Sequence, residues 1–277
     1  MTIAGVKIIL VEPAGPLNVG SVARVMKNFG LNQLVLVNPQ CDPWGTQARQ
    51  MAVHAQDILD GAVVVETLPA ALQGCKRAIA TTGVVHDWDA PLENPQTALP
   101  WLLEEIGQPA ALIFGREDRG LSNQELNYAQ RFVRISTSSS YSSLNLATSV
   151  AICCYELSLS QDIGKEDTGT RGEGDTQRRG DAENSPFSAS PSLHVTASNA
   201  SDSEIASIEI VEGYYQQLES LLLKIGYLYP HTAVSRMEKF RQLYNRTQLY
   251  KHEVAMLRGI LRQLEWAISS QKNHEKL

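Results

Sequence analysis

Several features that would point to particular protein classes are scarce in this 277-residue chain. It has four cysteines, without CxxC or Cys/His metal spacing, so we expect reduced, buried thiols and no bound metal. No window approaches the roughly 20 apolar residues of a membrane span. The first residues lack a basic segment followed by an apolar run, as in a signal peptide. We therefore expect a cytoplasmic protein that is not membrane-bound.

Motifs of common nucleotide-binding and hydrolytic enzymes are also missing. There is no GxGxxG, no GxSxG and no Walker loop, which argues against a dehydrogenase, an α/β hydrolase or a P-loop enzyme. The six histidines fall outside the glycine-rich and serine-rich loops described below. A Ser–His–Asp catalytic triad is therefore disfavoured.

The net charge of −6 is unevenly distributed. Residues 160–204 carry four basic and nine acidic side chains, whereas residues 205–277 carry ten basic and seven acidic ones. Local patches matter more than the sum for phosphate binding. The C-terminal part therefore remains a candidate for nucleic-acid binding.

The first zone, residues 1–159, alternates short apolar runs with helical patterns. Strands are predicted at 6–11, 34–37, 77–83, 110–115 and 131–135, and helices at 18–29, 46–59, 95–106, 122–129 and 145–159. Such alternation predicts an α/β fold, a parallel sheet with helices on both faces. Ligands bind such sheets at the carboxyl ends of their strands.

Two further zones follow. Residues 160–204 are rich in Gly, Ser, Asp and Glu with almost no apolar periodicity, which predicts a disordered acidic linker. Residues 205–277 show helical spacing and predict a small all-α extension. Its middle helix is expected at 235–247, with Ser235 and Glu238 forming a capping box. The linker is expected to tether these helices flexibly.

Three stretches carry features that suggest ligand binding. "EPAGPLNVGSVAR" (12–24) puts a stiff glycine-bearing turn at a strand end, with Asn18 or Ser21 as possible helix caps. Arg24, expected near the first helical turn, either grips a phosphate or is an ordinary surface arginine. "LIFGREDRGLSNQEL" (112–126) predicts a tight loop and a helix capped by Ser122.

The third stretch, "ISTSSSYSSLNLATSVAICCYEL" (135–157), passes from a strand end through a serine-rich loop into a helix near Asn145. Taken alone, its polar residues are either helix caps or ligand contacts. In this order, the three stretches resemble the motifs of the SpoU branch of the SPOUT methyltransferases. The C-terminal helices resemble those of the TrmJ group of tRNA ribose methyltransferases.

The resemblance implies a C-terminal trefoil knot, a rare topology, and an obligate homodimer with active sites at the interface. It also implies S-adenosylmethionine as methyl donor and a ribose 2′-hydroxyl at position 32 of the tRNA anticodon loop, on cytidine or uridine, as acceptor. Donor contacts would come from Thr81, Thr82, Gly83, Gly115, Glu117, Ile135, Ser142, Ser143 and Leu144. Catalytic roles would fall to Arg24, Ser143, Asn145 and Asn18.

Two points stay open at the level of sequence. TrmJ relatives often carry an arginine after the first donor loop, and residues 81–91 contain none; Arg116 and Arg119 are candidates to replace it. The C-terminal cations Arg236, Lys239, Arg241 and Arg246 are either an RNA-backbone patch or a solvated helix face. Methylation of ribosomal RNA and a catalytically inactive RNA-binding protein remain the alternatives.

Overall fold

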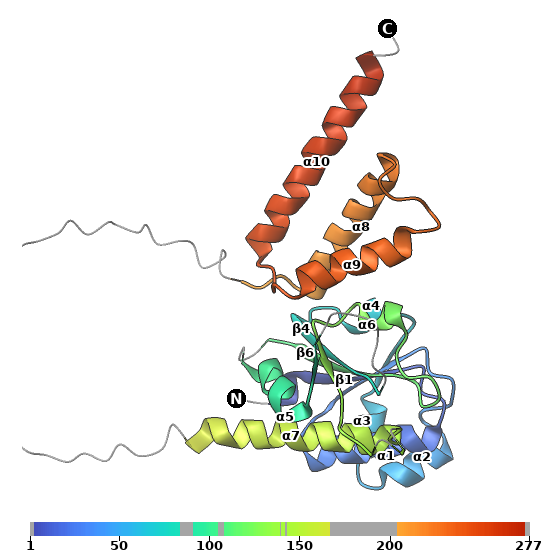
Figure 1. The fold of residues 1–277 in the computed structure, drawn as a ribbon. Coiled ribbons are helices and arrows are strands. Elements are labelled where there is room, and N and C mark those ends of the chain that lie inside the picture. Colours follow the sequence, from blue (N-terminus) through green and yellow to red (C-terminus); the bar gives the residue numbers. More distant parts are fainter. Residues whose placement is uncertain are drawn as a thin grey trace, which may run out of the picture.

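The computed structural model describes residues 3–83, 91–104, 108–138, 140–141, 143–166 and 204–274. Its N-terminal part holds a parallel sheet of seven strands in the order β3-β2-β1-β6-β4-β7-β5 (Figure 1). The strands are β1 (Val6–Val11), β2 (Gln33–Val37), β3 (Val63–Val65), β4 (Arg77–Thr81), β5 (Leu92–Glu93), β6 (Ala110–Phe114) and β7 (Arg131–Val133). The predicted parallel α/β sheet is confirmed.

Helices connect and cover the strands. They are η1 (Ile3–Gly5), α1 (Pro16–Asn28), α2 (Thr46–Ala52), α3 (Gln56–Asp60), α4 (Leu68–Ala71), α5 (Pro95–Ala98), η2 (Leu99–Leu103), α6 (Asn123–Leu126) and α7 (Leu146–Glu166). The C-terminal helices are α8 (Ile208–Lys224), α9 (Ala233–Asn245) and α10 (Lys251–His274). Most of the predicted linker, 160–204, lies outside the described residues.

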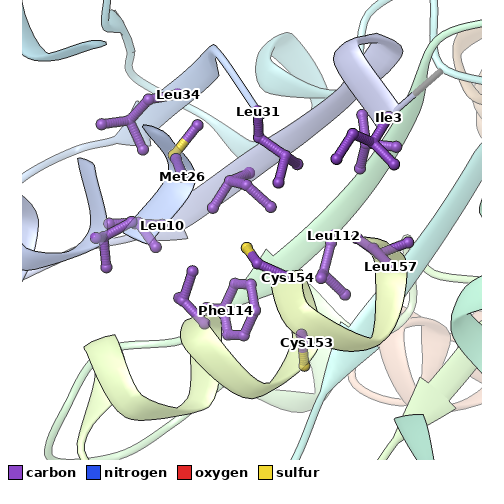
Figure 2. Packing of buried hydrophobic residues seen from close by; sticks show 14 of the residues in the cluster. Ile3, Leu10, Met26, Leu31, Leu34, Leu112, Phe114, Cys153, Cys154 and Leu157 are labelled. Carbon is purple, nitrogen blue, oxygen red and sulfur yellow. The ribbon is translucent and has the colours of Figure 1, made fainter. Parts of the chain in front are cut away.

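The sheet is buried on both faces, which explains why its strands read as continuous apolar runs. Along β1, Ile8 and Leu10 enter one core with α1 and α7, whereas Ile9 and Val11 enter a second core with α4 and α6. In Figure 2, Phe114 lies beside the two cysteines of α7.

The cysteine prediction is confirmed for α7. Cys153 and Cys154 are fully buried and unpaired, and burial raises the pKa of the Cys154 thiol to about 12. Their thiols are therefore protonated, inert packing groups at neutral pH. In the described part of the chain, no group of three or more His, Cys, Asp or Glu is placed to hold a metal ion.

Several local predictions were wrong. Helix α1 begins at Pro16 after Gly15, so Asn18 and Ser21 lie inside the helix and cap nothing. The helix predicted over 46–59 is broken at Val53, whose φ of 53° cannot continue it. Helix α9 begins at Ala233 with Thr232 before it, so the predicted capping box at Ser235 does not exist.

The C-terminal helices share a core of their own and also contact the α/β domain. The N–H of Ile208, the first residue of α8, donates to the carbonyl of Cys75 at 2.9 Å. Glu204 bridges Lys76 of the α/β domain and Lys251 of α10 at 2.8 and 2.6 Å. The helices are thus docked on the α/β domain, where the sequence suggested a flexible tether. None of the helices described is long and apolar enough to cross a membrane.

Candidate functional site

A pocket lies at the carboxyl ends of β4, β6 and β7. It has a volume of about 280 Å³, and three chain segments that are distant in sequence form its wall. The lining residues are Thr81, Thr82 and Gly83 at the end of β4 and after it, Phe114 to Leu121 at the end of β6 and after it, and Val133, Ile135, Ser143, Leu144, Leu146 and Ser149 from β7 to α7. The location is the one expected for a ligand site in a parallel sheet.

The loop after β6 is compact because two of its residues are glycines. A Cβ on Gly115 would overlap the backbone of Gly120 and Leu121, and Gly120 has a φ of +68° that disfavours side chains. The Gly120 N–H donates to the Arg116 carbonyl at 2.8 Å and closes the loop. Ser122 then caps α6 in a capping box with Glu125, so its predicted capping role is confirmed.

Glu117 ties this loop to the start of α1. Its carboxylate accepts hydrogen bonds from the Ala14 N–H at 2.9 Å, the Gly15 N–H at 3.1 Å and the Asn18 side-chain amide at 2.9 Å. Burial opposes the charge, but these donors outweigh it and lower the pKa of Glu117 below 4.5. Glu117 is therefore an ionised clamp between the first and second motifs.

Asn18 extends this connection to the third motif. Its side-chain oxygen accepts a hydrogen bond from the Asn145 amide at 3.0 Å. The Asn145 oxygen in turn accepts from the N–H groups of Ala147 and Thr148 at 2.9 and 3.3 Å, which caps the first turn of α7. Hydrogen bonds from Glu117 through Asn18 to Asn145 thus link all three motifs.

The two arginines of the β6 loop have different surroundings. Arg119 bridges Glu12, at the end of β1, and Glu125 at 2.9 Å each. Hydrogen bonds that Arg119 donates to Glu125 first, and then to Glu12, raise the pKa of Arg119. Both arginines line the pocket. Arg119 holds the loop against β1 through two carboxylates, whereas Arg116 pairs with the exposed Asp118. The replacement of the missing arginine by one of them stays a prediction.

Arg24 lies apart from this pocket. It is exposed on α1, in the third turn rather than the first, and is not among the pocket-lining residues. Six residues separate it from Asn18, which puts the two side chains about 120° apart around the helix. Within one chain, the Arg24 side chain therefore does not point toward the hydrogen bonds that Asn18 makes with Glu117 and Asn145.

The residues predicted to contact the methyl donor lie together around this pocket. Every predicted donor-contact residue that the structure describes lines the pocket; Ser142 lies outside the described residues. Sequence reasoning missed Leu146 and Ser149, on the first turn of α7, and the Glu12–Arg119–Glu125 bridge. Helical spacing from Asn145 would have found Ser149, one turn further on, but no local pattern pairs Glu12 with Arg119.

The predicted RNA-binding cations do not form one face. Arg236, Lys239 and Arg246 are exposed on or just after α9. Arg241 is instead paired with Glu212 at 2.5 and 2.6 Å, and its guanidinium lies 4.6 Å from the ring centre of Tyr215. The inclusion of Arg241 in an exposed patch is corrected: it is an internal residue of the C-terminal helices.

Comparison with known proteins agrees with this architecture. Residues 5–155 match the SpoU rRNA Methylase family, and residues 209–275 match the tRNA methyltransferase TrmJ, C-terminal domain. The chain belongs to the SpoU methylase family.

Relatives extend over nearly the whole chain. A tRNA (cytidine/uridine/adenosine-2′-O-)-methyltransferase TrmJ of Pseudomonas aeruginosa is 36% identical over 92% of each chain. A tRNA (cytidine/uridine-2′-O-)-methyltransferase TrmJ of Cronobacter sakazakii is 33% identical over 94% of this chain and 96% of its own. The solved structure of TrmJ from Z. mobilis superposes with a TM-score of 0.74, at 28% identity, over 94% and 98% of the two chains.

Proposed function

We propose that this protein is a tRNA 2′-O-methyltransferase that uses S-adenosylmethionine and acts on cytidine or uridine at position 32 of the anticodon loop. The observation that carries the proposal is the pocket lined by the second and third motif loops, to which the first motif is joined by the hydrogen bonds from Glu117 through Asn18 to Asn145. The names of the two TrmJ relatives support tRNA ribose as the acceptor.

The pocket suits an adenosyl group by its chemistry. Apolar walls from Leu144, Leu146 and Val133 accompany backbone and hydroxyl groups of Thr81 and Thr82, a mixture typical of small-molecule sites. The donor would be held by the loops after β4, β6 and β7, with Ile135 meeting the adenine through its backbone. When bound, it supplies an electrophilic methyl group on a sulfonium, so no metal is needed.

The protein must bring the ribose hydroxyl into line with this methyl group and assist loss of the proton. We assign the orientation of the ribose to Ser143, which lines the pocket, and to Asn145, which lies between the lining residues Leu144 and Leu146. Arginine is a poor base because its pKa exceeds about 12. We therefore assign to Arg24 the binding of the target phosphate and polarisation of the hydroxyl.

The position of Arg24 supports a homodimer in which one protomer's Arg24 serves the partner's donor pocket. A trefoil knot is part of the same proposal and is supported by family membership. The proposed domain bounds are 1–159, 160–204 and 205–277, and a cytoplasmic location follows from the tRNA substrate.

Two alternatives compete with this function. The family description names ribosomal RNA, but the match of residues 209–275 to the TrmJ C-terminal domain favours tRNA. Loss of catalysis is disfavoured because the Glu117–Asn18–Asn145 connection is intact.

The test is nucleoside mass spectrometry of unmodified tRNA incubated with the purified protein, with and without S-adenosylmethionine. We expect donor-dependent 2′-O-methylcytidine or 2′-O-methyluridine that maps to position 32. If the protein methylated ribosomal RNA and not tRNA, ribosomal RNA would replace tRNA as the proposed substrate. If the protein did not bind S-adenosylmethionine, the methyltransferase function would be refuted.

A further inference from the structure

The connection between α8 and α9 presents aromatic rings to solvent. Leu228 is 1% exposed and anchors this turn in the core of the C-terminal helices, whereas Tyr227 and Tyr229 on either side of it are 53% and 56% exposed. His231, two positions further on, is exposed as well.

Backbone hydrogen bonds hold this segment in place. The N–H groups of Tyr227 and Leu228 both donate to the Leu222 carbonyl at 3.0 Å, and the Thr232 N–H donates to the Tyr229 carbonyl at 2.9 Å. Gly226 makes the turn out of α8 with a φ of +75°. The exposed rings are thus supported by a fixed backbone, which reduces the entropy that binding would cost.

Aromatic and cationic groups surround the two rings. Tyr229 and His231 are stacked, with ring centres 6.0 Å apart and an angle of 22° between planes. The Arg236 guanidinium lies 5.8 Å from the ring centre of Tyr227, and one of its nitrogens donates to the Tyr227 carbonyl at 3.4 Å. The sequence has no acidic residue between Glu219 and Glu238.

We propose that Tyr227, Tyr229 and His231, with Arg236 beside them, form a platform on which unpaired RNA bases stack. Exposed aromatic rings flanked by cations are the usual means of binding unpaired bases. No carboxylate of the connecting segment itself would repel the phosphates. This aromatic platform rests on the proposed function, because it names how the RNA substrate is held.

The platform lies far from the donor pocket of its own chain. Helix α8 begins at Ile208, bonded to Cys75 of the α/β domain, and its 17 residues span about 25 Å. Its C-terminal end, where the platform starts, points away from the sheet (Figure 1). The platform therefore takes bases other than a nucleotide held at the donor pocket of its own chain.

The experiment measures the affinity of the full-length protein for an unmodified tRNA transcript over a series of salt concentrations. Tyr229→Ala removes a stacking surface and should weaken binding by about 5- to 150-fold. The salt dependence should be unchanged, because no phosphate contact is lost. Tyr229→Phe should bind as the unchanged protein does, whereas Arg236→Gln should reduce the salt slope by about one unit.

Tyr250→Ala is the matched control. Tyr250 is 40% exposed and stacks on His252 at 5.9 Å, but its N–H is bonded to the Glu253 carboxylate. Its removal should leave tRNA affinity unchanged. A single-stranded RNA should compete for the platform better than a blunt duplex of equal length, and Tyr229→Ala should abolish that preference.

Three results would overturn the platform. The first is that Tyr229→Ala binds tRNA with the affinity of the unchanged protein, and the second is that Tyr250→Ala loses as much tRNA affinity as Tyr229→Ala. The third is a change of oligomeric state in Tyr229→Ala, which would assign the rings to a protein contact. Failure of the proposed function is distinguishable, because the unchanged protein would then yield no donor-dependent methylated nucleoside.

Discussion

Replacement of Glu117 tests whether the three motif loops depend on one carboxylate. Glu117→Ala removes hydrogen bonds from two backbone N–H groups and from the Asn18 amide. Bonds to a charged acceptor contribute about 1.5–3 kcal/mol each when buried. Because the site is partly exposed, about 1 kcal/mol each is the better figure, so we expect a loss of about 3 kcal/mol.

The assay is thermal unfolding at pH 7, followed by circular dichroism. For 150–250 ordered residues, each kcal/mol shifts the Tm by about 2–4 °C, so Glu117→Ala should lower it by about 6–12 °C. Glu117→Gln should lower the Tm by less than Glu117→Ala, because the remaining side-chain oxygen still accepts hydrogen bonds from Gly15 and Asn18. The new amide nitrogen, however, cannot accept a hydrogen bond from the N–H of Ala14, so some stability is lost.

The pH dependence gives a second, independent test. The folded state lowers the pKa of Glu117 below 4.5, so its contribution is fully present above that value and is lost as the pH falls through the folded-state pKa. The Tm difference between the unchanged protein and Glu117→Gln should therefore shrink below about pH 4.

Asp118→Ala is the control for this series, because Asp118 is 64% exposed and pairs with Arg116 on the surface. It should change stability by less than about 0.5 kcal/mol. The role of Glu117 as a clamp would be refuted if Glu117→Ala also changed stability by less than about 0.5 kcal/mol. It would be refuted as well if the effect of the substitution on stability did not change with pH.

Three further predictions follow from the site and the docked helices. Gly115→Ala should cost more than about 2 kcal/mol in stability or displace the loop, because its Cβ overlaps Gly120, and calorimetry should show lost donor binding. Arg24→Ala should abolish methyl transfer yet keep donor affinity and thermal stability; loss of donor affinity would contradict its role. Arg241→Gln should lower stability by about 3–5 kcal/mol, since it leaves Glu212 without its partner, and a shift of tRNA affinity alone would contradict an internal role.

Strand prediction succeeded for the inner strands and failed for the two edge strands, β3 and β5. β1 and β6 are buried on both faces, and their sequences are apolar apart from Lys7. β3 was not predicted because it has three residues, two of them exposed, and β5 has only two residues. Neither presents enough of a pattern to differ from a loop.

The pocket was predicted by resemblance, but the bonds that hold it together were not predictable from spacing. Asn18 is separated by 99 positions from Glu117 and by 127 positions from Asn145. Local sequence reports helix caps and turns, whereas such pairings depend on the order of strands in the sheet. Arg241 shows the same limit, since Glu212 stands 29 positions away on another helix.

Helix α6 connects the two halves of the molecule. At its start, Ser122 closes the loop that borders the donor pocket. Just past its end, the carbonyl of Asn127 accepts a hydrogen bond from Asn245 of α9 at 3.0 Å, and Arg241 lies 5.5 Å from the ring centre of Tyr128. Because α6 has only four residues, about one helical turn separates these contacts from the loop that borders the donor pocket. The short helix α6 is thus a direct structural link between the C-terminal helices and that loop.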